Sequence, residues 1–160
     1  MAAGTYDEGD ASWVEAGPFR AHLRHLMSVG PLDEAEVAVV LGLSTRAVRH
    51  LLGGRAGRVP RRISPHTARR LLLVSAEDVH GLRWCVTPSG AARTALHRLL
   101  AAGWSPDAAA TAAGVGLDEL RTLAHDPRCN RLMAVRLLGL ARALPGTVDD
   151  QDLLPVAAAA

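Results

Sequence analysis

The fold of this chain is decided by residues 32–52, which read LDEAEVAVVLGLSTRAVRHLL. The spacing of the apolar residues predicts one helix over residues 32–41, with acidic side chains in its first turn, where they favour the positive end of the helix dipole. Gly42 is a typical helix stop, and Ser44 can cap a second helix that runs to residue 52. The stretch therefore predicts two short helices joined by a tight turn.

The turn has the residue types that a steep helix crossing requires. Ala38 is small where the two helices approach each other, and Gly42 allows the backbone to turn sharply. The apolar residues that would fix the crossing are Val37, Leu41, Leu43, Val48 and Leu51. The outward face of the second helix would carry Thr45, Arg46, Arg49 and His50. This arrangement is typical of a helix-turn-helix, whose second helix enters the major groove of DNA.

Basic residues continue after this pair of helices. Residues 53–63 read GGRAGRVPRRI, and Ser64 and Pro65 can then start a further helix whose core residues would be 71–74. Phosphate contacts are expected from Arg55, Arg58, Arg61, Arg62 and Arg69. Such contacts add affinity that does not depend on the base sequence, because they release counterions from the nucleic acid.

The chain also contains an internal repeat. Residues 20–30, RAHLRHLMSVG, align with residues 93–103, RTALHRLLAAG, and keep their apolar positions, while further on Gly42 aligns with Gly114. A pattern that recurs within one chain indicates two copies of one structural unit. There is no strand alternation and no hairpin signal. We therefore expect an all-α fold in which two tandem helix-turn-helix units, of three to four helices each, pack together.

The predicted boundaries follow the composition of the chain. They are a flexible acidic N-terminus at 1–17, a basic first helix-turn-helix unit at 18–75, a linker at 76–90, a second unit at 91–145 and a flexible acidic and alanine-rich tail at 146–160. The formal net charge is only +2, but the first unit has ten arginines against three acidic residues. A region of one sign favours a partner of the opposite sign, which here is a nucleic acid.

The second unit repeats the scaffold with a different surface. Ser105 and Pro106 open its second helix, and Gly114 turns into a third helix whose outward residues include Asp118, Glu119 and Arg121. This face is nearly neutral and partly acidic, so phosphates would repel it. Light contact with DNA and a role in packing, dimerisation or binding of a protein partner both remain open for this unit.

Other classes of protein are disfavoured by the composition. Cys85 and Cys129 match no zinc or thioredoxin spacing, which favours an intracellular chain without a disulfide framework. The first thirty residues show no secretory signal, and no apolar run approaches the roughly 20 residues that a membrane helix needs. We expect a cytoplasmic, nucleoid-associated protein that does not contact the membrane.

Signatures of catalysis are also missing from the sequence. It contains no nucleophile elbow, phosphate-binding glycine loop or pair of catalytic carboxylates, so we expect no enzyme, no cofactor and no metal. His22 and His25 are three residues apart but have no third ligand, and are interpreted as surface histidines. Trp13 and Trp104 are interpreted as apolar anchors.

Three short motifs carry a resemblance to a known group of proteins. They are SPHTARR at residues 64–70, SGAAR at residues 89–93 and GWS at residues 103–105. In these motifs, and in its overall pattern over residues 18–145, the chain resembles the helix-turn-helix DNA-binding proteins that are common in actinobacterial chromosomes and their phages. The resemblance implies a DNA-binding regulator, and the acidic third helix of the second unit departs from it.

Two hypotheses follow from the sequence. In the first, the protein is a transcriptional regulator that binds double-stranded DNA, with the first unit in the major groove and the basic loop on the backbone. The residues expected to contact DNA are Ser44, Thr45, Arg46, Arg49, His50, Arg55, Arg58, Arg61, Arg62 and Arg69. In the second hypothesis, degenerate helix-turn-helix folds serve as an adaptor that docks onto another protein, and a homodimer is open in either case.

Overall fold

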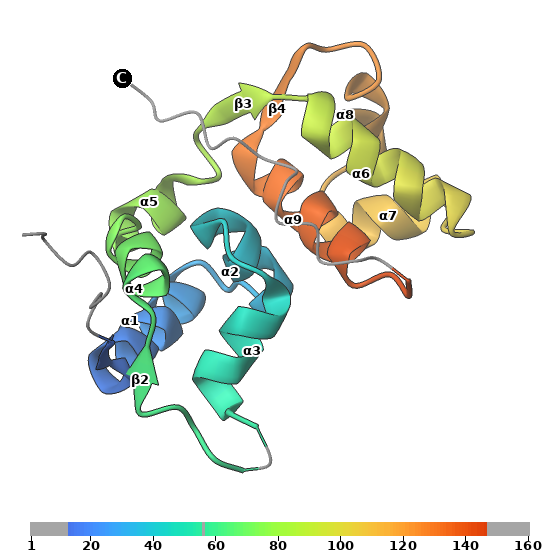
Figure 1. The fold of residues 1–160 in the computed structure, drawn as a ribbon. Helices are drawn as coiled ribbons and strands as arrows, with labels where there is room; N and C mark the ends of the chain where they lie inside the picture. Colours follow the sequence, from blue (N-terminus) through green and yellow to red (C-terminus); the bar gives the residue numbers. More distant parts are fainter. Residues whose placement is uncertain (1–12, 56, 147–160) are drawn as a thin grey trace, which may run out of the picture.

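The computed structural model describes residues 13–55 and 57–146. Within these residues nine helices and four short strands follow one another (Figure 1). The helices are α1 (Ala16–Val29), α2 (Glu34–Leu41), α3 (Thr45–Gly53), α4 (Pro65–Leu72), α5 (Ala76–Gly81), α6 (Gly90–Ala101), α7 (Pro106–Ala113), α8 (Leu117–Thr122) and α9 (Arg131–Arg142). The strands are β1 (Val14–Glu15), β2 (Arg62–Ile63), β3 (Val86–Pro88) and β4 (Arg128–Asn130).

The described part of the chain is mainly helical, as predicted. The terminal segments 1–12 and 147–160, which the sequence predicts to be flexible, lie outside the described residues. Among the described helices, none has the length and hydropathy that crossing a bilayer demands.

The strands are a correction to the sequence prediction, which expected none. β1 pairs antiparallel with β2, with Val14 opposite Ile63, and β3 pairs antiparallel with β4, with Thr87 opposite Cys129. Each strand has only two or three residues, which is too short for an alternating pattern to show. The paired strands are also far apart in the sequence, so no tight hairpin turn joins them and the sequence has no turn motif that would predict the pairing.

The order of the elements repeats along the chain. The first half, β1-α1-α2-α3-β2-α4, has the same order as the second half, β3-α6-α7-α8-β4-α9, and α5 lies between the halves. The turns after α2 and α7 also match, because Gly42 has φ 63° and Gly114 has φ 64°. The next amide donates to the same relative carbonyl in both, from Leu43 to Ala38 and from Val115 to Ala110. The internal repeat of the sequence is thus a repeat of local structure.

The expected linker at residues 76–90 contains regular structure, because this segment holds α5 and β3. Ser75 caps α5 through a capping box with Asp78. Val79 is 3 % exposed and packs so close to Gly30 at the end of α1 that a Cβ at Gly30 would collide with it. Helix α5 therefore belongs to the core of the first half, and a short helix of this length gives little periodicity in the sequence.

Three apolar side chains lie differently from the sequence prediction. Of the expected core residues 71–74, Leu71 is fully buried, but Leu72 and Leu73 are 72 % and 75 % exposed. Helix α4 packs one face only, so its neighbouring positions point to solvent. Trp13 is 61 % exposed and is not an anchor, whereas Trp104 is half-buried and packs against the second core.

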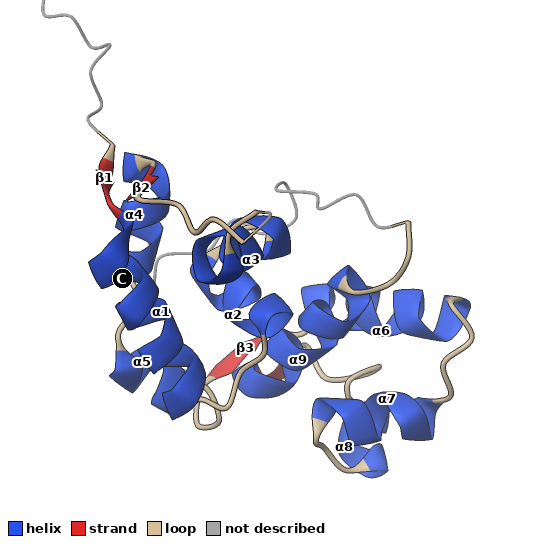
Figure 2. Cartoon of the chain, turned by 90° about the horizontal axis from the view of Figure 1, so that it is seen from below, coloured by secondary structure: helices blue, strands red, loops and turns tan. Residues whose placement is uncertain are grey.

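Buried apolar residues form two clusters, one in each half, and α9 contributes to both. Val135 of α9 belongs to the first cluster, and Leu137 of α9 belongs to the second. Helix α9 lies between α2 on one side and α6 and α7 on the other, as both ribbon views show (Figures 1 and 2). The contact between α2 and α9, called the seam below, joins the two halves.

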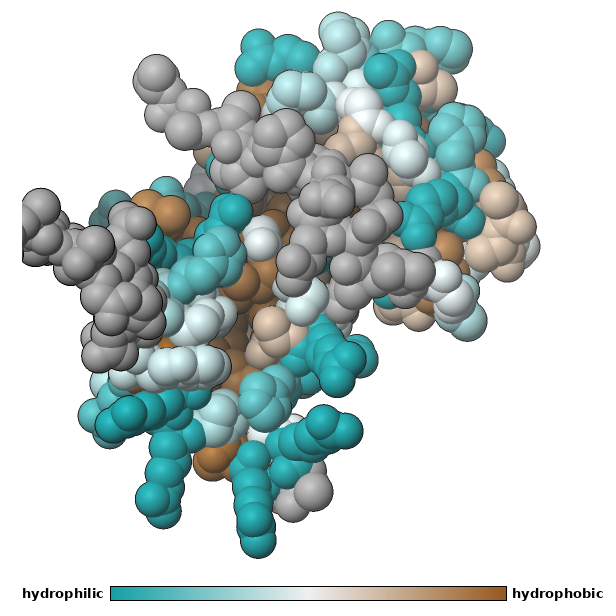
Figure 3. All heavy atoms as spheres, in the orientation of Figure 1, coloured by the Kyte–Doolittle hydropathy of each residue, from teal (hydrophilic) through white to brown (hydrophobic). Residues whose placement is uncertain are grey.

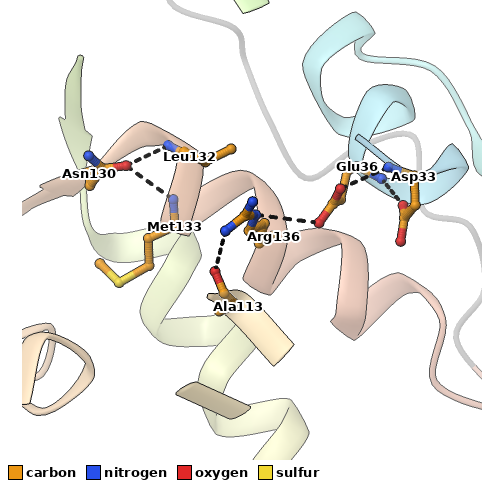
Figure 4. Close-up of polar contacts among 7 residues, drawn as sticks. All are labelled: Asp33, Glu36, Ala113, Asn130, Leu132, Met133 and Arg136. Carbon is orange, nitrogen blue, oxygen red and sulfur yellow. Dashed lines mark hydrogen bonds and ion pairs between the residues drawn. The ribbon is translucent and has the colours of Figure 1, made fainter. Parts of the chain in front are cut away.

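Polar groups fix the geometry of the seam (Figure 4). Arg136 donates to the carbonyl oxygen of Ala113 at 2.9 Å, and its Nε lies 3.9 Å from Oε1 of Glu36. Glu36 also forms a capping box with Asp33 at the start of α2. Gly139 lies so close to α2 that a Cβ there would stand 3.2 Å from the backbone nitrogen of Glu36. Close backbone approach and side-chain bonds therefore fix α9 against α2.

Candidate nucleic-acid interface

Helix α3 has a clear inward and a clear outward face. Ser44 caps it, as predicted, by accepting a hydrogen bond from the amide of Ala47 at 3.1 Å. Val48 and Leu51 are almost fully buried in the first core, which the sequence also predicts. The exposed residues of the helix include Arg46, Arg49 and His50. These three basic side chains thus occupy the outward face that the sequence assigns to them.

Thr45 is a correction, because it does not lie on the outward face. It is 8 % exposed, and its Oγ1 is the buried side-chain oxygen or nitrogen that has no hydrogen-bond partner among the described residues. Thr45 precedes Val48 by three residues, and residues three apart share one face of a helix. The helical period itself therefore turns Thr45 inward.

An open groove of about 870 Å³ runs along α3 and is called the arginine groove here. Its lining residues are Ala35, Ser44, Thr45, Arg46, Ala47, Arg49, His50, Gly54, Arg55, Arg142 and Ala143. The groove brings together six of the ten residues that the sequence proposes for DNA contact. It also includes residues that sequence reasoning missed, above all Arg142 at the end of α9.

An ion pair at the edge of the groove joins α3 to α2. Nε of Arg49 lies 2.8 Å from Oε2 of Glu34, and the two side chains are 63 % and 42 % exposed. An ion pair with this exposure contributes little to stability, because water and salt screen it. Its position matters more, since Glu34 places a negative charge beside the basic face of α3.

The loop after α3 is closed by its own backbone. The amide of Arg55 donates to the carbonyl oxygen of Arg58, and the amide of Arg58 donates to that of Arg55, each at 3.1 Å. Gly54 has φ 72°, and a Cβ there would collide with the carbonyl of Arg58. The loop therefore needs glycine at position 54 to form this narrow turn, which holds Arg55 at the groove.

Arg20 of α1 holds the two ends of this loop and was missed as a site residue. Its Nε donates to the carbonyl oxygen of Leu51 at 2.8 Å, and its Nη2 donates to that of Pro60 at 2.7 Å. The repeat could have revealed it, because Arg93 aligns with Arg20 and donates to the carbonyl oxygen of Ala124, two residues after α8, at 3.4 Å. Arg20 of α1 thus positions the basic loop through two hydrogen bonds to its backbone.

The remaining predicted residues lie away from the arginine groove. Arg61 and Arg62 line a second cavity of about 520 Å³, together with Glu15 and Arg20. Arg58 and Arg69 are exposed and line neither of these two cavities. Figure 3 shows hydrophilic side chains projecting from the end of the molecule where α3, β2 and the loop between them lie. The basic residues of the first half therefore form a broad surface rather than a single pocket.

The second half presents a different surface on its third helix. Arg121 of α8 pairs with Asp118 of the same helix at 3.2 Å, and both side chains are largely exposed. The N-cap of α8 is Gly116, which offers no side-chain cap. Helices α3 and α8 lie apart, on opposite sides of α9, in both ribbon views (Figures 1 and 2). The two third helices therefore do not form one continuous surface.

The histidines and cysteines provide no metal site in the part of the chain that the structure describes. His22 is half-buried rather than a surface residue, because its Nε2 lies 3.1 Å and 3.0 Å from the carbonyl oxygens of Leu71 and Val74. Cys129 is buried in the second core, and this burial raises the pKa of its thiol. A thiol that is harder to ionise is a poorer nucleophile and metal ligand.

Comparisons of this chain with protein-family models, with curated proteins and with solved structures find no match. Its function is therefore inferred from its own residues and their geometry.

Proposed function

We propose that this protein is a DNA-binding transcriptional regulator in which α2 and α3 act as a helix-turn-helix and α3 enters the major groove. One observation carries the proposal: the basic outward face of α3 borders the arginine groove, which further arginines line from two other segments. Arginine can donate two hydrogen bonds to the edge of guanine, so Arg46 and Arg49 are the residues that read bases.

The rest of the basic surface holds the DNA backbone. Arg55, Arg58, Arg61 and Arg62 follow α3 in the chain, and Arg69 extends the surface along α4. Contacts with phosphates position a protein on the duplex without reading its sequence. The resemblance to actinobacterial and phage helix-turn-helix proteins supports the same role, and a regulator of this kind acts in the cytoplasm on the nucleoid.

The second half serves mainly as a scaffold in this proposal. Its unit has the same element order, including a second pair of helices around Gly114, but α8 has no basic face comparable to that of α3. Helix α9 of this half supports α2 from behind through the seam. The second half therefore fixes the orientation of the helix-turn-helix, and its α8 is left for dimerisation or a further partner.

The test begins with selection of bound duplexes from a random pool by the purified full-length protein. The double variant Arg46→Ala and Arg49→Ala should then lose far more affinity for the selected site than for random DNA, because it removes base contacts. The matched control is Arg121→Ala on α8, which should change neither affinity. Equal losses of affinity for the selected site and for random DNA would show that α3 does not read bases.

The alternative function is an adaptor that binds another protein, and the paired charges on α8 favour it. A surface with Asp118 beside Arg121 suits a protein partner better than a polyanion. Salt separates the two functions: binding to a duplex should weaken steeply as salt rises, because each neutralised phosphate releases counterions. A protein that binds neither duplex nor heparin at low salt would support the adaptor.

A further inference from the structure

We infer that the second half of the chain completes the DNA site of the first half, because α9 places Arg142 where it can hold a backbone phosphate beside the start of α3. This inference rests on the proposed DNA binding and names a contact that the basic face of α3 does not itself provide. The ligand is a phosphate diester of the duplex.

The position of Arg142 is the first step. It is the last residue of α9, and its Nη1 donates to the carbonyl oxygen of Leu43 at 3.0 Å. Leu43 lies in the turn between α2 and α3, so this bond joins the second half to the turn of the helix-turn-helix pair. A guanidinium presents its N–H donors in a planar fork that matches the oxygens of a phosphate.

The seam makes this position a property of the fold. Val135 of α9 is buried in the first core, and Gly139 is in close contact with the backbone of α2 at Glu36. Arg142 follows Gly139 by three residues on the same helix, so it shares a face with the residue at the closest approach. The side chain is thus delivered to the groove by packed backbone, and little conformational entropy is lost when it binds.

The surroundings of Arg142 suit an anion. Arg46, Arg49 and Arg55 line the same groove from the first half. Helix α3, which has nine residues, begins at this end of the groove, and the positive end of a helix dipole favours phosphate groups. Independently, Thr45 lines the groove and is 8 % exposed, and its Oγ1 has no hydrogen-bond partner among the described residues.

The shape of the groove favours a duplex as the source of the phosphate. The groove is open and continues onto the exposed face of α3, which the proposed function places in the major groove. A backbone phosphate beside the major groove of the DNA would then lie at the edge of the arginine groove. A free phosphate compound has the same chemistry, so the test must separate these two sources.

The experiment compares Arg142→Gln with Arg83→Gln in the full-length chain. Arg83 is exposed and lines neither cavity, so it is a control for the loss of one positive charge. Affinity for the selected duplex is measured by fluorescence anisotropy over a series of salt concentrations. Loss of one phosphate contact should lower the slope of log K against log salt by about 0.9 in Arg142→Gln and leave it unchanged in Arg83→Gln. An unchanged slope in Arg142→Gln would overturn the inference.

A second measurement covers the case in which Arg142→Gln does not fold. Phosphates of the duplex are replaced one at a time by neutral methylphosphonates, and each duplex is bound to the wild type and to Arg142→Lys, which keeps the charge. Replacement of one particular phosphate should weaken binding by the wild type. The same replacement should weaken binding by Arg142→Lys less, because lysine cannot reproduce the arginine fork and so makes a weaker contact with that phosphate. Equal effects at every position would contradict a contact by Arg142.

Two further outcomes separate the possible failures. Inorganic phosphate is titrated onto the wild type and followed by NMR of the α3 amides. Binding of inorganic phosphate that needs Arg142, together with duplex binding that does not, would overturn the inference in favour of a free anion. If the wild type binds no duplex at low salt, the proposed function fails; if it binds and Arg142→Gln binds equally well with the same slope, only the present inference fails.

Discussion

Gly42 determines the direction in which α3 leaves α2, because its backbone has φ 63° and ψ 33°. An L-residue with a side chain pays a steric penalty of about 1–2 kcal/mol in this left-handed conformation, since its Cβ approaches the following carbonyl oxygen. Gly114 has the same conformation in the second half, with φ 64°. The turn that orients the proposed reading helix thus depends on one residue type in each copy.

Substitution of Gly42 by alanine should therefore lower the free energy of unfolding by about 1 kcal/mol. The matched control is Gly53→Ala at the end of α3, where a Cβ would meet no atom within 4 Å and the backbone is helical. This control should be neutral or slightly stabilising, because alanine reduces the freedom of the unfolded chain. Urea unfolding of both variants checks the difference, and equal losses would contradict it.

Glu36 is the residue whose charge is most affected by the seam. Burial raises its pKa above the ordinary value of 4.5, although the amide of Asp33 and the charge of Arg136 act in the opposite direction. A carboxyl with a higher pKa in the folded chain binds its proton more tightly there than in the unfolded chain. Its contribution to stability is therefore most favourable at low pH and falls as the pH rises from 4.5 through the folded pKa.

The variant Glu36→Gln should remove this pH dependence. Glutamine can still close the capping box at the start of α2, and it has no charge to bury. The melting temperature of the variant relative to the wild type should rise as the pH increases from below 4.5 to neutrality. The control is Glu119→Gln at an exposed position of α8, which gives the change in melting temperature expected from loss of one surface carboxylate. A difference between Glu36→Gln and wild type that stays constant over this range would disprove the assignment.

At the scale of single elements, local signals predict the helices and fail on the strands. The cap at Ser44 and the stop at Gly42 each act within a few residues, so the sequence places α2 and α3 well. Residues 76–90 were expected to be a linker, because α5 has only six residues and its burial depends on contact with α1. The outward placement of Thr45 is wrong, because Thr45 precedes the buried Val48 by three residues and shares its face of α3.

Helix α2 also limits what α3 can bind, through the ion pair between Glu34 and Arg49. In the proposed complex this carboxylate both competes for Arg49 and repels the phosphates. Replacement Glu34→Gln should tighten duplex binding by up to about fivefold, because exposed pairs of this kind contribute about 0.2–1 kcal/mol. Anisotropy titrations check this, with Glu77→Gln on α5 as the control for removal of one acid. Weaker binding by Glu34→Gln would show that the pair helps to orient Arg49.

At the scale of the whole molecule, α9 decides how the halves behave together. It places Val135 in the first core and Leu137 in the second, so neither core is complete without it. The sequence shows that there are two copies but gives no sign of how they pack. The bond from Arg142 to Leu43 joins residues 99 positions apart, and no local pattern can encode such a contact.

The shared helix should make the described part of the protein unfold in a single cooperative transition. Leu26→Ala in the first core and Leu99→Ala in the second, both at fully buried positions, should each lower the free energy of unfolding by about 2–5 kcal/mol. Differential scanning calorimetry should show one peak in the wild type, and both variants should move that same peak. Two peaks, of which each variant moves only one, would mean that the halves unfold independently.

The separation of α3 from α8 by α9 also has consequences for a molecule that sits on a duplex. If α3 lies in a groove of the nucleic acid, α8 faces away from it and stays accessible from solution. Substitutions on α8 can then accumulate, and a second macromolecule can bind there, without disturbing the contacts between α3 and the nucleic acid.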